Sequence, residues 1–510
     1  MSGRIGGRRP WLVWLVAAAL TVAGLATYAV AVPHDRLSAD AMTTPTITQP
    51  AAAAPPSAVP LTPAPGGTGR PLAAPAVYAS HNGELNVTLV AAQRRVTIAG
   101  RRVLAKVYGD SFVAPTLVVR PGDMIRVKLV NHLDEPTNLH FHGLEVSPSG
   151  HADNIFVSVD PGKSFQYAFR LPRSAPTGTF WYHSHEMVPM SQMTRYPNAY
   201  SEEQVFDGLS GLIEVQGLTA DLPAGLHDVV QRYLALRDVQ VADGAIASSQ
   251  INSNGPTTRL VDGQLQPRIT IAPGQTELWH IANIGADIFY RLALPGHSFD
   301  VIAQDGHPVI HATPERTLLL PPGKRFDVLV RGGRRGITPL ETLFYNEGDD
   351  HYPERTLATV DTTGPARRPQ PAPSVISWGS VDLGYAHIVR RRVVVFSENQ
   401  AGTVFYIDGQ SYDPAKINFH ARVNTVERWT IVNHTDETHP FHMHTYPMQL
   451  MSVNGVPQAF NGYQDEIVLP PHGYVVARID FADYTGITVF HCHILAHEDA
   501  GMMANIEVSR

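Results

Sequence analysis

The sequence predicts an all-β protein built from three Greek-key β-sandwich domains. From about Val77 onward, short β-branched runs of alternating polarity are punctuated by Pro-Gly and Asn, and convincing helical stretches are few. Two segments also recur three times along the chain. Such recurrence indicates three related domains rather than one large sandwich.

The first recurring segment is a turn, an alternating strand that ends in Val-Asn or Ala-Asn, and a second strand. Its copies are RPGDMIRVKLVNHLDEPTNLHFH, APGQTELWHIANIGADIFYRLAL and ARVNTVERWTIVNHTDETHPFHMH. The second segment recurs as DPGKSFQYAF…GTFWYHSH, PPGKRFDVLV…ETLFYNEG and PPHGYVVARI…GITVFHCH. These copies place the domains at residues 77–218, 222–365 and 374–510, with the Pro-rich residues 364–373 as the last linker.

An apolar segment precedes the domains. The uncharged run from Trp11 to Val32 follows several arginines, so residues 1–33 are expected to be a signal peptide or membrane anchor. Its length favours an anchor, whereas Ala-Val-Ala at 29–31 resembles a cleavage site and RRPWL loosely resembles a twin-arginine signal. Both interpretations make the protein extracytoplasmic, either anchored to the outer face of the cytoplasmic membrane or exported. Residues 34–76, rich in Pro, Ala and Thr, are expected to form a flexible, disordered linker.

Composition argues against some classes of partner. The formal charge is only −7 over 510 residues and no long basic run is present, so nucleic acid is not an expected partner. The chain has one cysteine, Cys492, so no disulfide within the chain organises the fold. A monomer is expected, which contacts a membrane only if the apolar segment is not cleaved.

Four His-x-His pairs lie at equivalent positions in the first and third repeats, whereas the middle repeat has Leu292/Leu294 and Asn346/Gly348 there. One such pair alone is more often a coincidence, but four at equivalent positions are not. Residues i and i+2 of a strand point to one face, and neutral imidazole binds copper, zinc, iron and nickel. A closed tetrahedral zinc site does not need eight imidazoles. The pairs, expected to converge between the two outer domains, are His140/His142, His183/His185, His442/His444 and His491/His493.

Cys492 indicates which metal these histidines bind. It lies between His491 and His493, so on a strand its sulfur points to the face opposite their rings. Two histidines, a thiolate and a weak thioether form the ligand set of a blue-copper electron-transfer centre. His497 and Met502 follow Cys492 by five and ten residues, and His439 precedes the His442/His444 pair. Consecutive residues would then connect the thiolate copper to the histidine cluster.

The motifs HFHG, WYHSH, HPFHMH and HCHILAHEDAGMM, in this order over three repeats, resemble those of the three-domain multicopper oxidases. The resemblance covers residues 77–510, and HGLEVSPSGHADNIF is similar to bacterial members. It implies cupredoxin-like domains and copper ions of types 1, 2 and 3. It also implies that one-electron oxidations of a substrate at the type 1 copper are coupled to reduction of O₂ to water at a trinuclear cluster.

The resemblance assigns a role to each motif residue. The type 1 copper would be held by His439, Cys492, His497 and axial Met502. The type 2 copper would be held by His140 and His442. The type 3 pair would be held by His142, His183, His185, His444, His491 and His493. Two carboxylates occupy the positions of family proton relays and are candidate catalytic residues: Glu498 and Asp153. Exposed or salt-bridged carboxylates are the alternative interpretation.

The substrate stays open between phenolic compounds and the metal ions Cu(I) and Fe(II). Met502 as the axial ligand favours a lower type 1 potential, which suits easily oxidised donors. The segment HEMVPMSQMTRYP supplies a candidate Cu(I) substrate site, although thioethers at this spacing also serve packing: Met187, Met190 and Met193. Asp436 and Glu437 precede His439 and offer guidance to a cationic donor, but solvated loop charges are the favoured interpretation.

The alternative function is a copper-sequestering protein of copper tolerance, outside the cytoplasm, in which oxidase turnover is incidental. A copper nitrite reductase uses a mononuclear catalytic copper and would not require all four histidine pairs.

Overall fold

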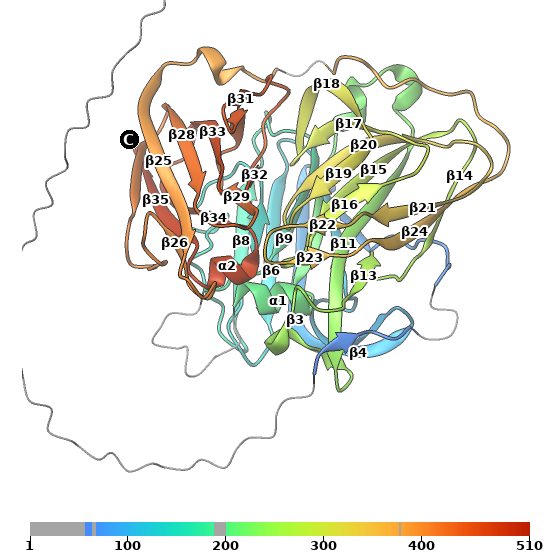
Figure 1. Ribbon diagram of the computed structural model, residues 1–510, viewed down its shortest axis with the longest axis horizontal. Helices are drawn as coiled ribbons and strands as arrows, with labels where there is room; N and C mark the ends of the chain where they lie inside the picture. Colours follow the sequence, from blue (N-terminus) through green and yellow to red (C-terminus); the bar gives the residue numbers. More distant parts are fainter. Residues whose placement is uncertain (1–56, 64–67, 188–199, 377–378) are drawn as a thin grey trace, which may run out of the picture. The chain divides into compact units, whose positions relative to one another are not determined.

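A computed structural model of the chain describes residues 57–63, 68–187, 200–376 and 379–510 (Figure 1). The apolar residues 1–33 and residues 34–56 and 64–67 of the expected linker lie outside the described residues. The other linker residues pack on the middle repeat, where Val59 pairs with Val241 and the Leu72 N–H donates to the Arg268 carbonyl, so the expectation of a disordered linker is wrong there. Within the described part, strands dominate and the helices are short, so the predicted all-β fold is confirmed. The helices are α1 (Ser201–Asp207), α2 (Leu495–Asp499) and the 3₁₀ turns η1 (Leu218–Asp221), η2 (Ala224–Leu226), η3 (Ser248–Gln250) and η4 (Leu383–Tyr385). None of the helices in these ranges is long and apolar enough to cross a membrane.

Each repeat contains one sheet in which a first strand pairs in parallel with a second, and the second pairs antiparallel with a third. A parallel pair requires the chain to leave the sheet and return, which gives the Greek-key crossing that the sequence predicts. In chain order the strands are β3 (Glu84–Ile98), β6 (Met124–Asn131) and β8 (Ser164–Arg170); β11 (Val230–Ala242), β15 (Thr276–Asn283) and β20 (Arg325–Arg331); β25 (Ile388–Glu398), β28 (Val426–Asn433) and β33 (Tyr474–Asp480).

The opposite sheet of each sandwich also has one order in all three repeats. Two antiparallel pairings are followed by one parallel pairing. The strands are β7 (His140–His142), β9 (Gly178–His183), β10 (Ser210–Val215) and β5 (Thr116–Val119); β16 (Tyr290–Ala293), β21 (Gly336–Thr342), β24 (Arg355–Thr362) and β14 (Arg268–Ile271); β29 (His439–Met443), β34 (Gly486–Cys492), β35 (Met503–Ser509) and β27 (Phe419–Arg422). The repeats are therefore copies of one fold.

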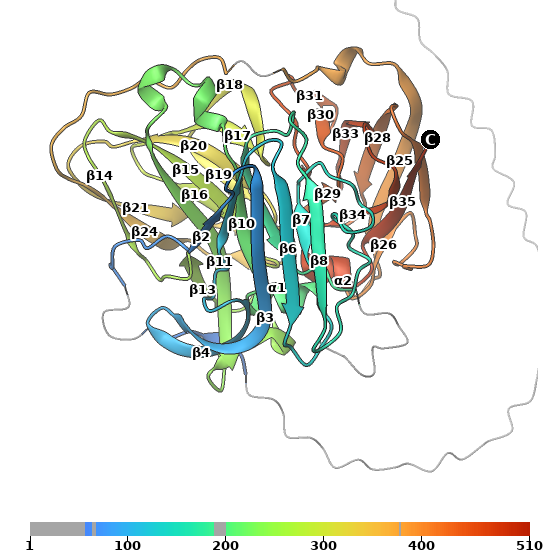
Figure 2. The same ribbon diagram turned by 180° about the vertical axis from the view of Figure 1, so that it is seen from behind.

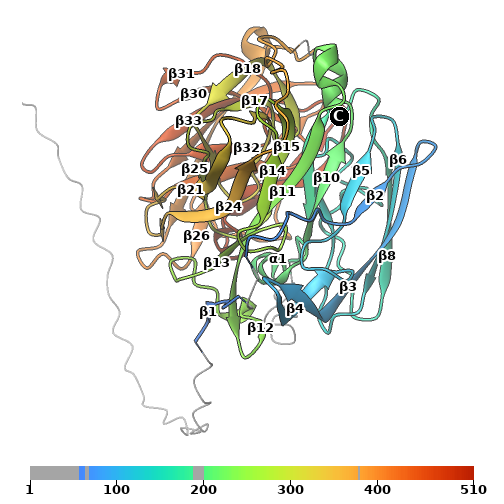
Figure 3. The same cartoon turned by 90° about the vertical axis from the view of Figure 1, so that its right-hand side faces the viewer.

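The other strands extend or join these sheets. They are β1 (Val59–Pro60), β2 (Val77–Ala79), β4 (Arg101–Tyr108), β12 (Ala245–Ile246), β13 (Thr258–Val261), β17 (Phe299–Gln304), β18 (His307–Glu315), β19 (Thr317–Leu320), β22 (Tyr345–Asn346), β23 (His351–Tyr352), β26 (Phe405–Ile407), β30 (Met448–Val453), β31 (Val456–Pro457) and β32 (Glu466–Leu469). Where β12 pairs with β4, a 12-stranded sheet joins the first and middle repeats (Figure 3). Figure 2 shows three strands of this sheet, β3, β6 and β8, side by side. The repeat pattern did not predict this junction.

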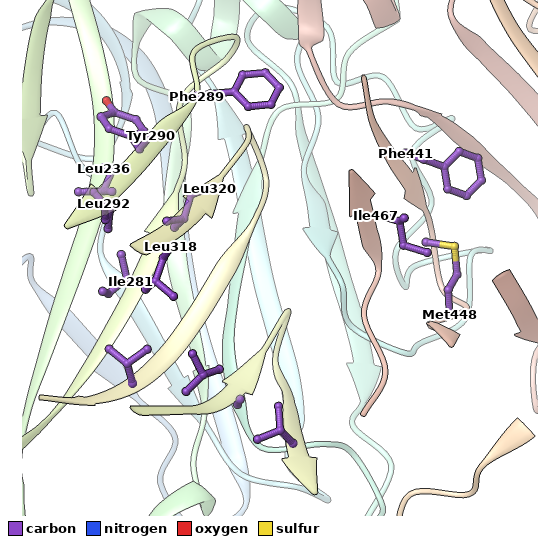
Figure 4. Packing of buried hydrophobic residues seen from close by; sticks show 14 of the residues in the cluster. Leu236, Ile281, Phe289, Tyr290, Leu292, Leu318, Leu320, Phe441, Met448 and Ile467 are labelled. Carbon is purple, nitrogen blue, oxygen red and sulfur yellow. The ribbon is translucent and has the colours of Figure 1, made fainter. Parts of the chain in front are cut away.

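The three repeats pack through apolar faces. In β28, buried and half-buried residues alternate strictly, so Trp429 and Ile431 face the core. One continuous apolar cluster extends from the middle into the third repeat, and Figure 4 shows its two groups, one around Ile281 and the other around Phe441. The strands β10 and β11 lie side by side where the first repeat meets the middle one (Figure 3). Buried apolar area thereby fixes the outer repeats in position.

Candidate metal centres

The strands bring the four histidine pairs together. In the first repeat, His140 on β7 lies opposite His183 on β9. In the third repeat, His442 on β29 lies opposite His491 on β34. Rings from the two repeats stack on each other, with the centroids of His140 and His444 4.0 Å apart. All eight imidazoles are buried, so the predicted convergence between the outer repeats is what the structure contains.

Several ring nitrogens in this cluster lack ordinary hydrogen-bond partners. Buried nitrogens without a partner include Nε2 of His140, His183 and His442. Elsewhere two ring nitrogens face each other, as Nε2 of His444 and Nε2 of His491 do at 3.0 Å. Sets of three ligand atoms lie within 4.8 Å of one another. Nitrogens buried in this way have unused lone pairs, so the residues present fit bound metal ions.

Burial keeps seven of the eight imidazoles neutral. Desolvation, followed by the neighbouring histidines, lowers the pKa of His140 and His442 well below the ordinary value. Desolvation lowers the pKa of His183 to about 3 and that of His185 to about 4. The rings therefore offer lone pairs at neutral pH, as copper requires.

Hydrogen bonds at Nδ1 orient several rings. Nδ1 of His140 lies 2.9 Å from Asp153 Oδ1, and Nδ1 of His442 lies 2.9 Å from the Asp465 carbonyl oxygen. Nδ1 of His491 lies 2.7 Å from the carbonyl oxygen of Cys492. A proton held at Nδ1 leaves Nε2 free and directed into the cluster.

Both candidate proton-relay carboxylates lie against the cluster, and neither is exposed. Glu498 Oε2 is 3.0 Å from Nδ1 of His491, and Oε1 is 3.5 Å from Nδ1 of His185. Burial alone would raise the pKa of Glu498, but these two histidines hold it below the ordinary value. Burial raises the pKa of Asp153 to about 8, although the Phe141 N–H donates to it. Each carboxylate therefore touches a ring of the cluster directly.

The second candidate centre surrounds Cys492. Its Sγ is 3.5 Å from Nδ1 of His439 and 3.8 Å from Nδ1 of His497, and these two nitrogens are 3.3 Å apart. Met502 is fully buried, and its carbonyl oxygen accepts a hydrogen bond from the Cys492 N–H. Burial raises the pKa of the Cys492 thiol well above the ordinary value, so a metal ion is needed to hold the thiolate.

A hydroxyl fixes the orientation of His439. Thr435 Oγ1 lies 2.7 Å from His439 Nε2 and donates to Oδ1 of Asn433 at 2.8 Å. Since that hydroxyl proton goes to the asparagine, its oxygen accepts the proton of Nε2. Nδ1 of His439 is left free on the side of Cys492.

The sequence did not reveal Arg325 and Asp465. Arg325, from the middle repeat, donates two hydrogen bonds to Asp465 at 2.7 and 2.6 Å. Asp465 Oδ1 also lies 3.3 Å from His142 Nε2. Neither residue lies in a histidine motif, so no local pattern could have found them. The repeat without histidine pairs therefore supports the cluster through an ion pair.

An acidic pocket of about 250 Å³ adjoins the Cys492 centre. Glu437 is buried, and its Oε2 lies 3.4 Å from Nε2 of His497, so the favoured interpretation of Glu437 as a solvated loop charge is wrong. Asp436 is exposed, as expected. The pocket also contains carboxylates of the middle repeat that the sequence did not single out: Glu347, Asp349 and Asp350.

The methionine segment is described only at its start. Met187 is half-buried and packs against the apolar cluster of Ile155, Val489 and Met503. Met190 and Met193 lie outside the described residues.

Comparison with known proteins identifies the family. Models of multicopper oxidase domains match residues 91–216, 225–334 and 389–510. The chain belongs to the multicopper oxidase family. The multicopper oxidase mco of Staphylococcus epidermidis is 28% identical over 421 residues, covering 79% of this chain and 83% of that relative. The multicopper oxidase MmcO of Mycobacterium tuberculosis is 27% identical over 476 residues, covering 87% and 92%.

A solved structure of a laccase has the same fold. The laccase from Pediococcus acidilactici superposes with a TM-score of 0.74 at 26% identity, covering 88% of this chain and 95% of that laccase. This multicopper oxidase is a copper-dependent oxidoreductase that couples substrate oxidation to reduction of O₂ to water. Its cofactors are four copper ions, of types 1, 2 and 3. Family membership favours this activity over the copper-sequestering alternative.

Proposed function

We propose that this multicopper oxidase oxidises a small metal cation, Fe(II) or Cu(I), in the acidic pocket beside His497. The observation that carries the proposal is the lining of that pocket. Carboxylates surround the ring edge of His497, and none of the described residues lining the pocket is Lys or Arg. A pocket with this charge attracts a cation and raises its local concentration.

The pocket suits a metal ion better than a phenol. Oε1 of Glu347 and Oε2 of Glu437 are buried without hydrogen-bond partners. Burial, followed by the charge of Glu437, raises the pKa of Glu347 to about 9, so like charges oppose each other there. The aromatic side chain in the lining, Phe405, is already stacked on His497 with centroids 4.1 Å apart. A phenol ring needs a larger, mostly apolar pocket.

We assign the coppers as the family pattern implies. The type 1 copper would be held by His439, Cys492, His497 and Met502, the type 2 copper by His140 and His442, and the type 3 pair by His142, His183, His185, His444, His491 and His493. Copper bound there would supply one-electron transfer and the reduction of O₂. The fit rests on buried, unpartnered ring nitrogens and on the convergence at Cys492.

The residues between the centres connect them. The Cys492 carbonyl oxygen accepts the Nδ1 proton of His491, so the thiolate residue is joined to the cluster by the chain and by a hydrogen bond. Glu498 and Asp153 are proposed to hold and deliver the protons that oxygen reduction consumes. Glu498 would do so at Oε2 beside His491, and Asp153 at Oδ1 beside His140.

The remaining proposals rest on sequence. We propose domain boundaries at 77–218, 222–365 and 374–510, and an extracytoplasmic monomer that residues 1–33 either anchor or export. Residues 34–56 would space the oxidase from the membrane. Cu(I) docking at the segment of Met187 stays a prediction.

Oxygen uptake with Fe(II), Cu(I) and a phenol tests the substrate. Glu347→Gln should raise KM for the cations about tenfold and change the phenol kcat/KM by less than about twofold, because a bound cation displaces the proton of Glu347 and uses its carboxylate, whereas a phenol does not. Asp436→Asn, at an exposed neighbour of Glu437, is the matched control and should change neither. An equal loss for phenol and cations would refute the cation pocket. Absence of uptake with any donor would restore the sequestering alternative.

A further inference from the structure

Three carboxylates, one from each repeat, meet beside α1 and α2. Glu202 lies on α1, Asp499 ends α2, and Asp287 lies in the loop between β15 and β16. The two helices pack against each other (Figure 1). Backbone groups fix two of the carboxylates, since the Glu202 N–H donates to Asp499 Oδ2 at 2.8 Å and the Ala496 N–H donates to Asp287 Oδ1 at 3.2 Å.

The arrangement leaves a buried oxygen unsatisfied. The side chains of Glu202 and Asp287 lie within hydrogen-bond reach of each other, and burial, followed by neighbouring carboxylates, raises the pKa of both. Ionised carboxylates only accept hydrogen bonds, so neither group satisfies the other. Asp287 is 3% exposed, and its Oδ2 has no hydrogen-bond partner. A buried acceptor that faces a second acceptor requires a positive species between them.

The described chain supplies no such species from a side chain. Among the described residues, Lys106 is the cation whose charge acts on Glu203 of α1, and it forms ion pairs with Glu135 and Asp207. Burial raises the pKa of Asp287, and the charged groups that raise this pKa further are carboxylates, with Glu202 first. Burial and the charges of Glu498 and Asp287 likewise raise the pKa of Asp499. In these ranges no Lys or Arg side chain forms an ion pair with any of the three carboxylates.

We propose that Glu202, Asp287 and Asp499 bind one hard divalent cation of the Ca²⁺ class. The donors are all carboxylate oxygens, which such cations prefer, and neither histidine nor cysteine belongs to the set. Glu202 and Asp499 are half-buried, so water reaches the site and completes the coordination. A single shared proton would neutralise only one of the three charges.

The cation would tie the three repeats together near the type 1 centre. Asp287 holds the N–H of Ala496, and Asp499 follows Glu498 on the same helix. The bound ion would thus fix α2, which carries His497 and Glu498, against α1 of the first repeat.

Calorimetric titration of the copper-loaded enzyme with Ca²⁺ tests the proposal. One Ca²⁺ per chain should bind, and thermal unfolding should shift upward at Ca²⁺ of about 5 mM, above the ~10⁻⁴–10⁻³ M affinities of extracellular sites. Asp287→Asn and Glu202→Gln should each weaken Ca²⁺ binding about tenfold or more, because affinity follows the number of charged ligands. No binding and no shift in unfolding temperature with Ca²⁺ or Mg²⁺ would overturn the proposal.

Two control variants locate the ion. Glu203→Gln changes the neighbour on α1 that faces Lys106 and should retain Ca²⁺ binding. Glu347→Gln alters the acidic pocket and should retain it too. Loss of binding in Glu347→Gln but not in Asp287→Asn would place the cation in that pocket and reject the junction site. A higher unfolding temperature for Asp287→Asn without any Ca²⁺ binding would show a shared proton instead.

Discussion

The middle and third repeats contain the same buried asparagine but differ in the residues that follow it. Asn283 and Asn433 end equivalent strands, and each donates from Nδ2 to one carbonyl of its own loop and to one across the sandwich. Each also accepts a loop N–H at Oδ1. Asn131 of the first repeat makes the same set of bonds. The asparagine is therefore a requirement of the fold.

The residues that follow are specific to each repeat. The third repeat has His442 and His444 nine and eleven residues after its asparagine, whereas the middle repeat has Leu292 and Leu294 at these offsets. Both leucines are buried in the apolar core. One scaffold thus accepts either metal ligands or core residues on the same strand, so metal binding and folding can be perturbed separately.

Cys492→Ser should give the largest effect of the substitutions that test metal binding. The change removes the thiolate but little buried volume, so the blue colour and turnover should disappear while the fold persists. Visible absorption, circular dichroism and copper analysis check this outcome. A variant that stays blue would show that Cys492 does not bind the type 1 copper.

His442→Gln should separate the two centres within the third repeat. His442 lies in the cluster rather than beside Cys492, so the blue colour should persist while O₂ uptake falls by more than the ~10–100-fold typical of losing an outer-shell partner. Oxygen uptake and visible absorption are measured on the same sample. Normal turnover in this variant would contradict the type 2 assignment.

Glu498→Gln should leave both centres loaded but slow the reaction. The amide keeps the shape of a side chain that touches His491 and cannot hold the proton, so turnover should fall about 10²-fold. Copper content and blue colour serve as controls, and both should match the parent enzyme. A purely structural role would instead lower the copper content.

Asn283→Ala should give the smallest effect on turnover and act on stability alone. Two donated hydrogen bonds are lost and their carbonyl acceptors stay buried, so the free energy of unfolding should fall by about 2–3 kcal/mol. Thermal unfolding measures this loss, with copper content unchanged. Asn433→Ala, the matched variant, should also weaken the blue colour, because Asn433 supports the loop of His439.

Local patterns predicted the fold and the convergence of the histidine pairs, while the contacts that the middle repeat makes with the other two escaped prediction. Alternation along a strand determines which residues share a face, so the spacing of His140 and His142 predicted that their rings point the same way. The burial of Glu437 could not be predicted from the sequence. A hairpin of the middle repeat covers it, with the Thr438 N–H donating to the Glu347 carbonyl at 2.7 Å. Such packing depends on how whole sandwiches meet, which no short sequence pattern records.

The hydroxyl of Thr435 has a consequence for electron transfer. It joins the ring of His439, which faces Cys492, to Asn433, the buried asparagine whose equivalent ends the same strand in every repeat. The ring of His439 is thus held in place by the fold itself, with its Nδ1 3.5 Å from the Cys492 sulfur. A ligand held in this way changes little between two oxidation states, and a small reorganisation energy makes each electron transfer fast.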